Sequence, residues 1–253
     1  MALAEPFATG DSLLHRLDPR AKLVAAIVWS LPLAVLNDLR VLLLGVVVSA
    51  MLLAAARLDP PRLLRRLLLV NVFVGFLWLF LPWSVSGEPV ATWGPIAVTR
   101  EGLLLALKLT LRCNAIVGAW IALLGTSRLT AIAQALRALH VPEKLVLIMF
   151  FCVRYIQAIH DEYGRMAAAI RSRAFAPKTT VHTYRTYANL VGLLLVRSHD
   201  RAARVYDAMI CRGFDGRLHT LDAHRLRTRD VVATAVLSGL TLVLVVMECL
   251  TTG

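Results

Sequence analysis

The clearest pattern in the chain is a series of long apolar runs that are separated by short charged or polar segments. Runs of this kind are typical of helices that cross a lipid bilayer. Several are shorter than the ~20 residues of a full crossing, so short or tilted helices are expected. The pattern predicts about five membrane-spanning helices, at residues 23–37, 41–56, 67–87, 103–127 and 231–247.

Local signals mark where some of these helices should begin. Asp18-Pro19 has the form of an N-cap followed by proline at the first helical position, which predicts a helix start before the first run. Thr99 is a candidate cap for the helix of the fourth run. Between the third and fourth runs, residues 90–99 hold two short β-prone segments on either side of a Gly-Pro pair, which predicts a small hairpin.

Composition agrees with insertion into a membrane. The 253 residues are 58% hydrophobic and only 17% charged, and the mean hydropathy is +0.68, which is too apolar for an ordinary soluble domain. The net charge of +12 suits cytoplasmic loops and partner surfaces, and little aromatic interleaving argues against nucleic acid. The four cysteines show neither a disulfide framework nor zinc-site spacing: Cys113, Cys152, Cys211 and Cys249.

The positive charges predict the orientation of the chain. If the N-terminus lies in the cytoplasm, the inside segments 1–22, 57–66 and 127–230 hold 24 of the 28 Lys and Arg residues. The outside loops then hold only Arg40 and Arg100, and the remaining two lie within the fourth run. Since positive residues concentrate on the cytoplasmic side, we expect the N-terminus inside and the C-terminus outside.

The long segment between the fourth and fifth runs is predicted to form a helical arm. Three helical patterns appear, at 130–139, 144–173 and 184–212. Each long helix begins with an apolar stretch too short to span a bilayer and becomes basic and amphipathic, so the two should pack on each other or along the membrane edge. The predicted fold is an all-α integral membrane protein. Its expected parts are a transmembrane region, cytoplasmic coupling helices and a last transmembrane helix, at 1–127, 128–227 and 228–253.

The two long helices of the arm end alike. Segments 165–175 and 204–214 share identical residues at four aligned positions, and they close as Arg173-Ala174-Phe175 and Arg212-Gly213-Phe214. A cation is favoured at a helix C-terminus, where a guanidinium can pair with a carboxylate or cap carbonyl groups of a partner. Two interpretations stay open. Each ending is an ordinary helix stop, or the pair is a docking surface for something present in two copies.

These endings belong to a wider resemblance. The residues that carry it are Gly10-Asp11-Ser12, 15–22, 99–102, Arg154-Tyr155, Asp161-Glu162, Arg165-Met166, Arg197-Ser198 and 204–216. Over nearly its whole length the chain resembles the transmembrane T component of energy-coupling factor (ECF) transporters. Within that group it is most similar to the CbiQ branch of cobalt and nickel systems.

The resemblance implies a non-catalytic subunit of a bacterial inner-membrane importer. Such a subunit joins two cytoplasmic ABC-type ATPases to a substrate-binding membrane subunit. The partner ATPases use ATP, and the coupling chain itself binds no cofactor and no metal. The implied cargo is cobalt, with nickel or a vitamin as alternatives.

The resemblance also implies which residues couple to the ATPases. Each coupling helix of the family ends in an X-Arg-X motif that docks into a groove of one ATPase. By position the two motifs are Ser172-Arg173-Ala174 and Cys211-Arg212-Gly213. The usual form is Ala-Arg-Gly or close to it, so the first copy differs by lacking glycine and the second by its cysteine.

Other polar residues suggest alternatives. Polar side chains within the runs are costly in lipid and should face other helices or a partner: Asn71, Lys108, Arg112 and Asn114. A stand-alone carrier or channel could use them, but it predicts an internal repeat among the spans, and none is evident. His160-Asp161-Glu162 has metal-ligating residue types, yet consecutive helical residues point in different directions, so a solvated or salt-bridged face is expected. No phosphate-binding Gly-Lys-Ser/Thr loop or catalytic triad pattern is visible.

Overall fold

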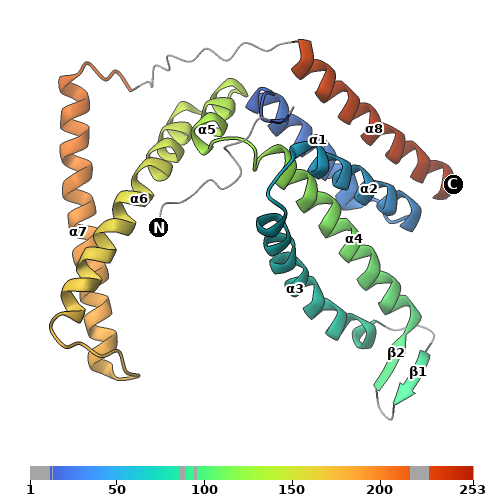
Figure 1. The fold of residues 1–253 in the computed structure, drawn as a ribbon, viewed down its shortest axis with the longest axis horizontal. Helices are drawn as coiled ribbons and strands as arrows, with labels where there is room; N and C mark the ends of the chain where they lie inside the picture. The colour runs from blue at the N-terminus through green and yellow to red at the C-terminus, as the bar shows by residue number, and fades with distance from the viewer. Residues whose placement is uncertain (1–11, 13, 86–88, 94–95, 217–227, 253) are drawn as a thin grey trace. The chain divides into compact units, whose positions relative to one another are not determined.

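The computed structural model describes residues 12, 14–85, 89–93, 96–216 and 228–252 (Figure 1). The chain divides into two compact units. Among the described residues, those up to 135 and those from 228 onward form the membrane unit, and residues 136–216 form the arm. The arm is therefore an insertion in the sequence of the membrane unit, just before its last helix.

The membrane unit is built from five helices and one hairpin among its described residues. Its helices are α1 (Pro19–Val35), α2 (Leu39–Ala56), α3 (Pro60–Ser84), α4 (Arg100–Leu123) and α8 (Thr228–Thr252). Helices α2, α3, α4 and α8 are long and apolar enough to cross a membrane. Helix α1 overlaps the first predicted span but has only 17 residues, so it falls short of the length of the other four.

The predicted hairpin region contains two paired strands. Strand β1 (Pro89–Trp93) runs antiparallel to β2 (Ile96–Thr99), with Trp93 opposite Ile96. The Gly-Pro turn that the sequence suggests lies outside the described residues. Thr99 then ends β2 and begins α4, because its hydroxyl accepts a hydrogen bond from the Gly102 backbone N–H at 3.3 Å.

Aspartate caps start two further helices. The Asp18 carboxylate accepts the backbone N–H of Arg20 at 2.9 Å, and Pro19 occupies the first helical position as predicted. The Asp38 carboxylate accepts the N–H of Arg40 at 3.0 Å at the start of α2. Both caps satisfy backbone donors that have no partner within their own helix.

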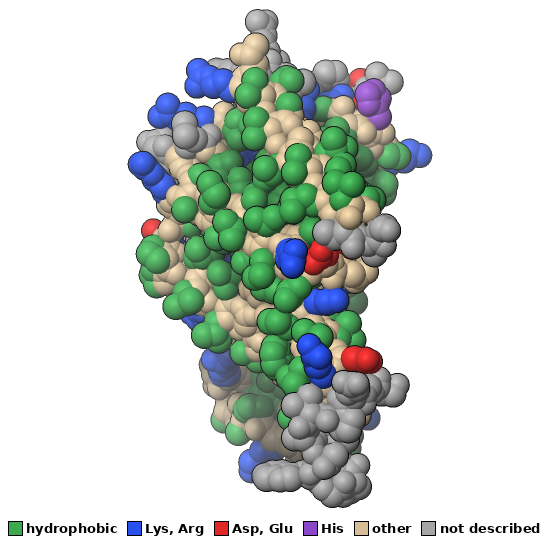
Figure 2. All heavy atoms as spheres, turned by 90° about the vertical axis from the view of Figure 1, so that its right-hand side faces the viewer, with side chains coloured by type: hydrophobic (Ala, Val, Ile, Leu, Met, Phe, Trp, Pro, Cys, Tyr) green, Lys and Arg blue, Asp and Glu red, His purple; other side chains and the backbone are tan. Residues whose placement is uncertain are grey.

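The core of the membrane unit lies where α1, α2 and α4 pack closely. Trp29, Leu33, Leu42 and Ala115 are fully buried there. Small residues allow the close approach: a methyl group on Gly45 would lie 2.8 Å from the Leu33 side chain. Outside this core the unit is apolar on its surface, and Figure 2 shows a face of the molecule on which hydrophobic side chains gather. An apolar exterior is what lipid contact requires.

A buried lysine joins three helix ends at one side of the membrane unit. Lys22 is 2% exposed, and its ammonium group donates to the hydroxyls of Thr126 at 3.1 Å and Ser127 at 2.9 Å, just after α4. The Asp18 backbone N–H donates to the Asp230 carboxylate of α8 at 3.0 Å. We call these five residues the lysine clamp. It places a cation at the negative end of the α4 dipole and ties α1, α4 and α8 together.

An arginine joins the same helices elsewhere. Arg112 of α4 donates to the Leu36 carbonyl at 2.5 Å and to the Asn37 side chain at 3.1 Å, and so caps the C-terminal end of α1. The Asn37 backbone N–H donates to Glu248 of α8 at 2.6 Å. These four residues form the arginine clamp, so Arg112 acts in helix packing rather than facing lipid.

Two further hydrogen-bonded pairs fasten α3 to α4. Asn71 and Asn114 exchange amide hydrogen bonds of 3.0 and 2.9 Å, and the Trp78 indole donates to Thr110 at 2.8 Å. Asn71, Arg112 and Asn114 therefore face other helices, as predicted for polar groups within the spans. Lys108 is half-buried on α4.

The arm is a pair of long helices with a short helix before them. Helix α5 (Leu129–Ala138) crosses the boundary between the two units, and α6 (Glu143–Arg171) and α7 (Val181–Cys211) form the arm proper. All three lie within a few residues of the predicted bounds. Thr180 caps α7 by accepting the Thr183 N–H at 3.4 Å.

Removing the lysine of the lysine clamp should destabilise the membrane unit. Lys22→Ala takes away the ammonium group that joins α1 to the end of α4, together with its favourable charge interaction with Asp18 and Asp230. We expect a loss of about 2 kcal/mol in the free energy of unfolding, measured by denaturant unfolding in detergent. Arg16→Ala is the matched control, since Arg16 is an exposed cation on the same segment. Equal losses in the two variants would contradict the clamp.

Candidate docking surface on the arm

The first ending of the arm is a left-handed turn that follows α6. The backbone N–H of Ala174 donates to the Arg171 carbonyl at 3.1 Å, and Ala174 has a φ of +57°. This is the geometry in which one residue in the left-handed conformation closes a helix, a position that glycine usually occupies. Ser172, Arg173 and Ala174 are all exposed there.

The second ending also places its small residue in the left-handed conformation. Gly213 has a φ of +78°, and its N–H donates to the Ile210 carbonyl at 2.9 Å. The N–H of Phe214 reaches back to the Met209 carbonyl at 3.0 Å, which completes a Schellman motif. Cys211, Arg212 and Gly213 are exposed. Both copies thus place the small residue in the left-handed conformation, and the second ending adds the hydrogen bond from Phe214.

The two endings lie far apart. One precedes α7 and the other follows it, and α6 and α7 run in opposite directions (Figure 1). A 31-residue helix is roughly 46 Å long, so the two arginines are separated by about that distance. The predicted site residues thus form two separate tips, each with one exposed arginine, rather than one shared patch.

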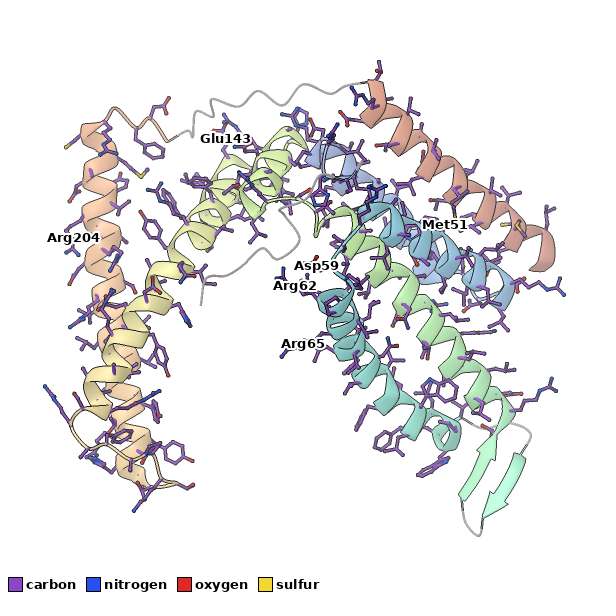
Figure 3. The ribbon with its side chains drawn as sticks, in the orientation of Figure 1. Met51, Asp59, Arg62, Arg65, Glu143 and Arg204 are labelled. Atoms are coloured by element: carbon purple, nitrogen blue, oxygen red, sulfur yellow. The ribbon has the colours of Figure 1, made fainter. Side chains whose placement is uncertain are left out.

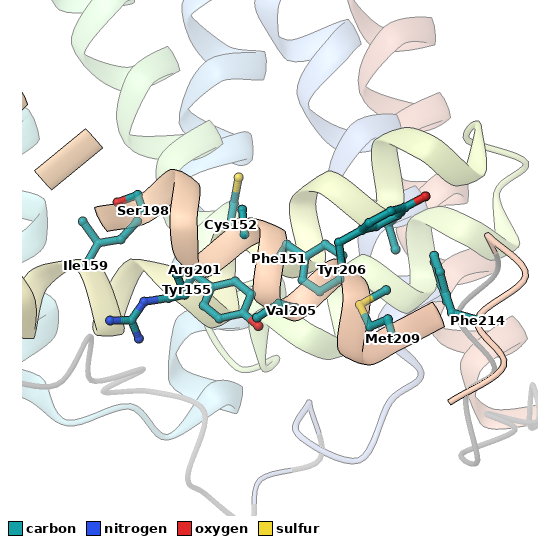
Figure 4. A pocket seen from close by; sticks show the side chains of 12 residues that line it. Phe151, Cys152, Tyr155, Ile159, Ser198, Arg201, Val205, Tyr206, Met209 and Phe214 are labelled. Carbon is teal, nitrogen blue, oxygen red and sulfur yellow. The ribbon is translucent and has the colours of Figure 1, made fainter. Parts of the chain in front are cut away.

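Each tip is held by its phenylalanine. The Phe175 ring lies 6.0 Å from the Tyr187 ring, nearly perpendicular to it, and 6.3 Å from the His182 ring. Phe214 packs over the other end of the hairpin and lines an apolar groove there (Figure 4). Both phenylalanines are partly buried, so they fix the turn while the neighbouring arginine stays in solvent.

A buried carboxylate joins the two long helices between the tips. The Glu162 side chain of α6 is only 11% exposed and pairs with Arg165 at 2.5 Å, with Arg197 of α7, and with Arg201 of α7 at 3.7 Å. Hydrogen bonds from Arg165 and then Arg197 lower the pKa of Glu162 below its ordinary value. His160 and Asp161 are exposed, and Glu162 is part of the salt-bridged face that the sequence predicted.

Beyond Glu162 the two helices diverge and leave an apolar groove of about 500 Å³. Phe151 and Tyr155 of α6 and Val205, Tyr206 and Met209 of α7 line it (Figure 4). Sequence reasoning did not find this groove. The aromatic and branched residues that line it are visible in the sequence, but nothing there indicates that the helices separate at this level.

The chain matches known proteins over most of its length. The family model CbiQ, described as cobalt transport protein, matches residues 10–221. The energy-coupling factor transporter transmembrane protein EcfT of Ruminiclostridium cellulolyticum is 24% identical over 246 residues, which is 91% of each chain. The nickel permease LarQ of Lactiplantibacillus plantarum is 28% identical over 235 residues, 91% of this chain and 78% of that protein.

One further relative is a larger protein. A Bifidobacterium longum protein named as an ABC transporter ATP-binding protein is 28% identical over 179 residues. The match covers 66% of this chain but only 23% of the relative, so the similarity concerns about a quarter of that protein's length.

Alanine should have opposite effects at two glycines, because Gly213 lies in a left-handed turn and Gly164 lies within a helix. Gly213→Ala should weaken the last turn of α7 by about 1 kcal/mol, because an L-side chain is strained at positive φ. Gly164→Ala, in the middle of α6 where a methyl group meets open space, should instead stabilise its helix. Amide hydrogen exchange of the intact chain in detergent measures both. The geometry is contradicted if the two substitutions shift protection in the same direction.

The Glu162 cluster predicts an acid-sensitive arm. Because its folded pKa is lowered, the carboxylate contributes stability that is fully present above its unfolded pKa and is lost as the pH falls through the folded value. Glu162→Gln should therefore lower the unfolding temperature at pH 7. The difference in unfolding temperature between the variant and wild type should become smaller as the pH falls towards about 3. Asp161→Asn, an exposed neighbour with the same charge change, is the control. If the difference in unfolding temperature does not change with pH, the ionised Glu162 side chain does not stabilise the arm.

Proposed function

The chain belongs to the CbiQ family of cobalt transport proteins, and from this premise we propose that it is the transmembrane coupling subunit of an ATP-driven importer. The observation that carries the proposal is the pair of exposed arginine tips, alike in backbone form and held at opposite ends of α7. The ATP-binding relative supports the same assignment, because part of a protein named for ATP binding is similar to this chain.

Each tip docks into a groove of one ATPase subunit. The guanidinium of Arg173 or Arg212 enters the groove and pairs with a carboxylate or with backbone carbonyl groups. Neighbouring residues are small, and the helix dipole adds negative potential that favours the cation at the tip. The two tips are separated by roughly the length of α7, and this separation suits two subunits that lie side by side and have separate binding grooves.

The arm transmits the movement of the ATPases. When the two subunits close on ATP, the bound tips must move with them. Glu162 of α6 pairs with Arg197 and Arg201 of α7 between the tips, so that movement of one helix is passed to the other. Movement of either tip then reorients the apolar groove, which we assign to contact with the substrate-binding membrane subunit.

The chain lies in the bacterial inner membrane with its N-terminus in the cytoplasm. The short loops place seven Lys and Arg residues on the N-terminal side and two on the other, which supports this orientation. It brings the arm into the cytoplasm, where the ATPases bind ATP. This chain itself performs no chemistry and binds neither ATP nor the transported metal.

The transported substrate is cobalt, and nickel is the second candidate. The family description names cobalt, whereas the relative from Lactiplantibacillus plantarum is named a nickel permease. A separate membrane subunit selects between the two ions. The carrier alternative is weakened, because Asn71, Arg112 and Asn114 are engaged in helix packing.

Charge reversal at the tips tests the proposal. The chain is co-expressed with its ATPase pair and the membrane subunit, and the complex is purified through one ATPase. Arg173→Glu or Arg212→Glu alone should weaken association, and the double variant should lose both the ATPases and cobalt uptake. Arg185→Glu with Arg204→Glu is the matched control, since both arginines are exposed on α7 and the charge change is the same. Figure 3 labels Arg204 on this helix.

Two outcomes would overturn the assignment. In the first, the double tip variant keeps full association and uptake. In the second, the chain alone carries cobalt or nickel into liposomes without ATP, which makes it a carrier. Parallel uptake assays with the two metals decide between cobalt and nickel.

A further inference from the structure

Helix α3 carries an outward stripe that the membrane unit does not use. Only Val74 and Pro82 of this helix are buried, and they belong to the side that packs on α4. The opposite side is a row of large apolar residues, each at least half exposed, at the spacing of one helix face: Leu69, Val72, Phe73, Phe76, Phe80 and Trp83. In a membrane this stripe meets lipid chains or another protein.

One end of the same stripe is strongly basic. Arg62, Arg65 and Arg66 occupy the first turns of α3, at the spacing that continues the stripe, and all three are exposed. Figure 3 shows Arg62 and Arg65 projecting from this end of α3, away from α4. The Asp59 carboxylate lies 3.1 Å from the Arg62 guanidinium, so it orients that side chain next to the turn between α2 and α3.

From this arrangement we propose that the outward stripe of α3 is a binding site for an anionic phospholipid. The arginines bind the phosphate of the headgroup, and the acyl chains lie along the apolar stripe. The inference rests on the insertion of α3 in the membrane and not on the coupling function.

The dimensions of the stripe fit a lipid. From Leu69 to Trp83 a helix advances roughly 21 Å, which is more than half the ~30 Å hydrocarbon thickness of a bilayer and so long enough for the acyl chains of one leaflet. The arginines then lie at headgroup level and the apolar residues at the depth of the chains. The Phe76 and Phe80 rings, 4.5 Å apart between centroids, give the chains a broad aromatic surface.

A lipid fits this stripe better than a neighbouring helix. Close packing between membrane helices uses small residues that let backbones approach, whereas this stripe presents large aromatic and branched side chains. A partner helix would also have to supply negative charge beside the arginines. Anionic phospholipids supply it together with flexible chains that adapt to an uneven surface.

The test is lipid binding to the purified full chain. Native mass spectrometry in a neutral detergent counts dioleoyl phosphatidylglycerol molecules bound per chain, with dioleoyl phosphatidylcholine as the uncharged comparison. Wild type should prefer phosphatidylglycerol, and Arg62→Gln with Arg65→Gln should weaken its binding by about 10- to 30-fold. The matched control, Arg40→Gln with Arg100→Gln, removes two exposed arginines at other helix ends and should bind as wild type does.

Two further arms make the outcome decisive. Arg62→Lys with Arg65→Lys keeps the charge and should retain most of the binding, and circular dichroism checks that every variant is equally helical. Millimolar glycerol 3-phosphate should not displace the lipid, because the apolar stripe contributes to binding. The proposal is overturned if both lipids bind equally, if the two glutamine variants behave alike, or if glycerol 3-phosphate displaces phosphatidylglycerol.

Discussion

The membrane unit depends on a buried cation. The Lys22 ammonium group is shielded from water, and its charge is tolerated because two hydroxyls accept hydrogen bonds from it, the α4 dipole ends beside it, and Asp18 and Asp230 lie near. The Asp18–Asp230 hydrogen bond joins residues 212 positions apart. Since the arm is inserted between α4 and α8, this clamp closes the membrane unit around the insertion. The arginine clamp also joins α1, α4 and α8, at a second place in the membrane unit.

The arm uses the opposite arrangement, with one carboxylate among three arginines. Glu162 of α6 pairs with two arginines of α7 at one level of the arm. A tight turn joins the helices on one side of this level, and the apolar groove lies between them on the other side. The Glu162 ion pairs therefore join the two long helices at one level. The tips are defined by their left-handed turns and by the packing of Phe175 and Phe214, and their exposed arginines remain available to a partner.

The sequence predicted what local rules determine. Hydrophobic runs located the four long spans, Asp18 and Thr99 marked helix starts, and the repeated endings indicated both arm tips. It did not predict which groups meet across the fold. Nothing local pairs Lys22 with Thr126, and Glu162 was recognised only as a member of a polar helix face. Helix α1 also ends sooner than its apolar run, because Leu36 and Asn37 turn away to meet Arg112.

The central claim is that each arm tip contacts one ATPase, and photo-crosslinking tests it most directly. The photoreactive residue benzoylphenylalanine replaces Ser172 or Cys211 in the assembled transporter, beside each arginine but without removing it. We expect a crosslink to one ATPase subunit from each position, and none from Gly164 in the middle of α6. It is contradicted if Ser172 and Cys211 crosslink to no ATPase, or if the Gly164 position labels the ATPase equally.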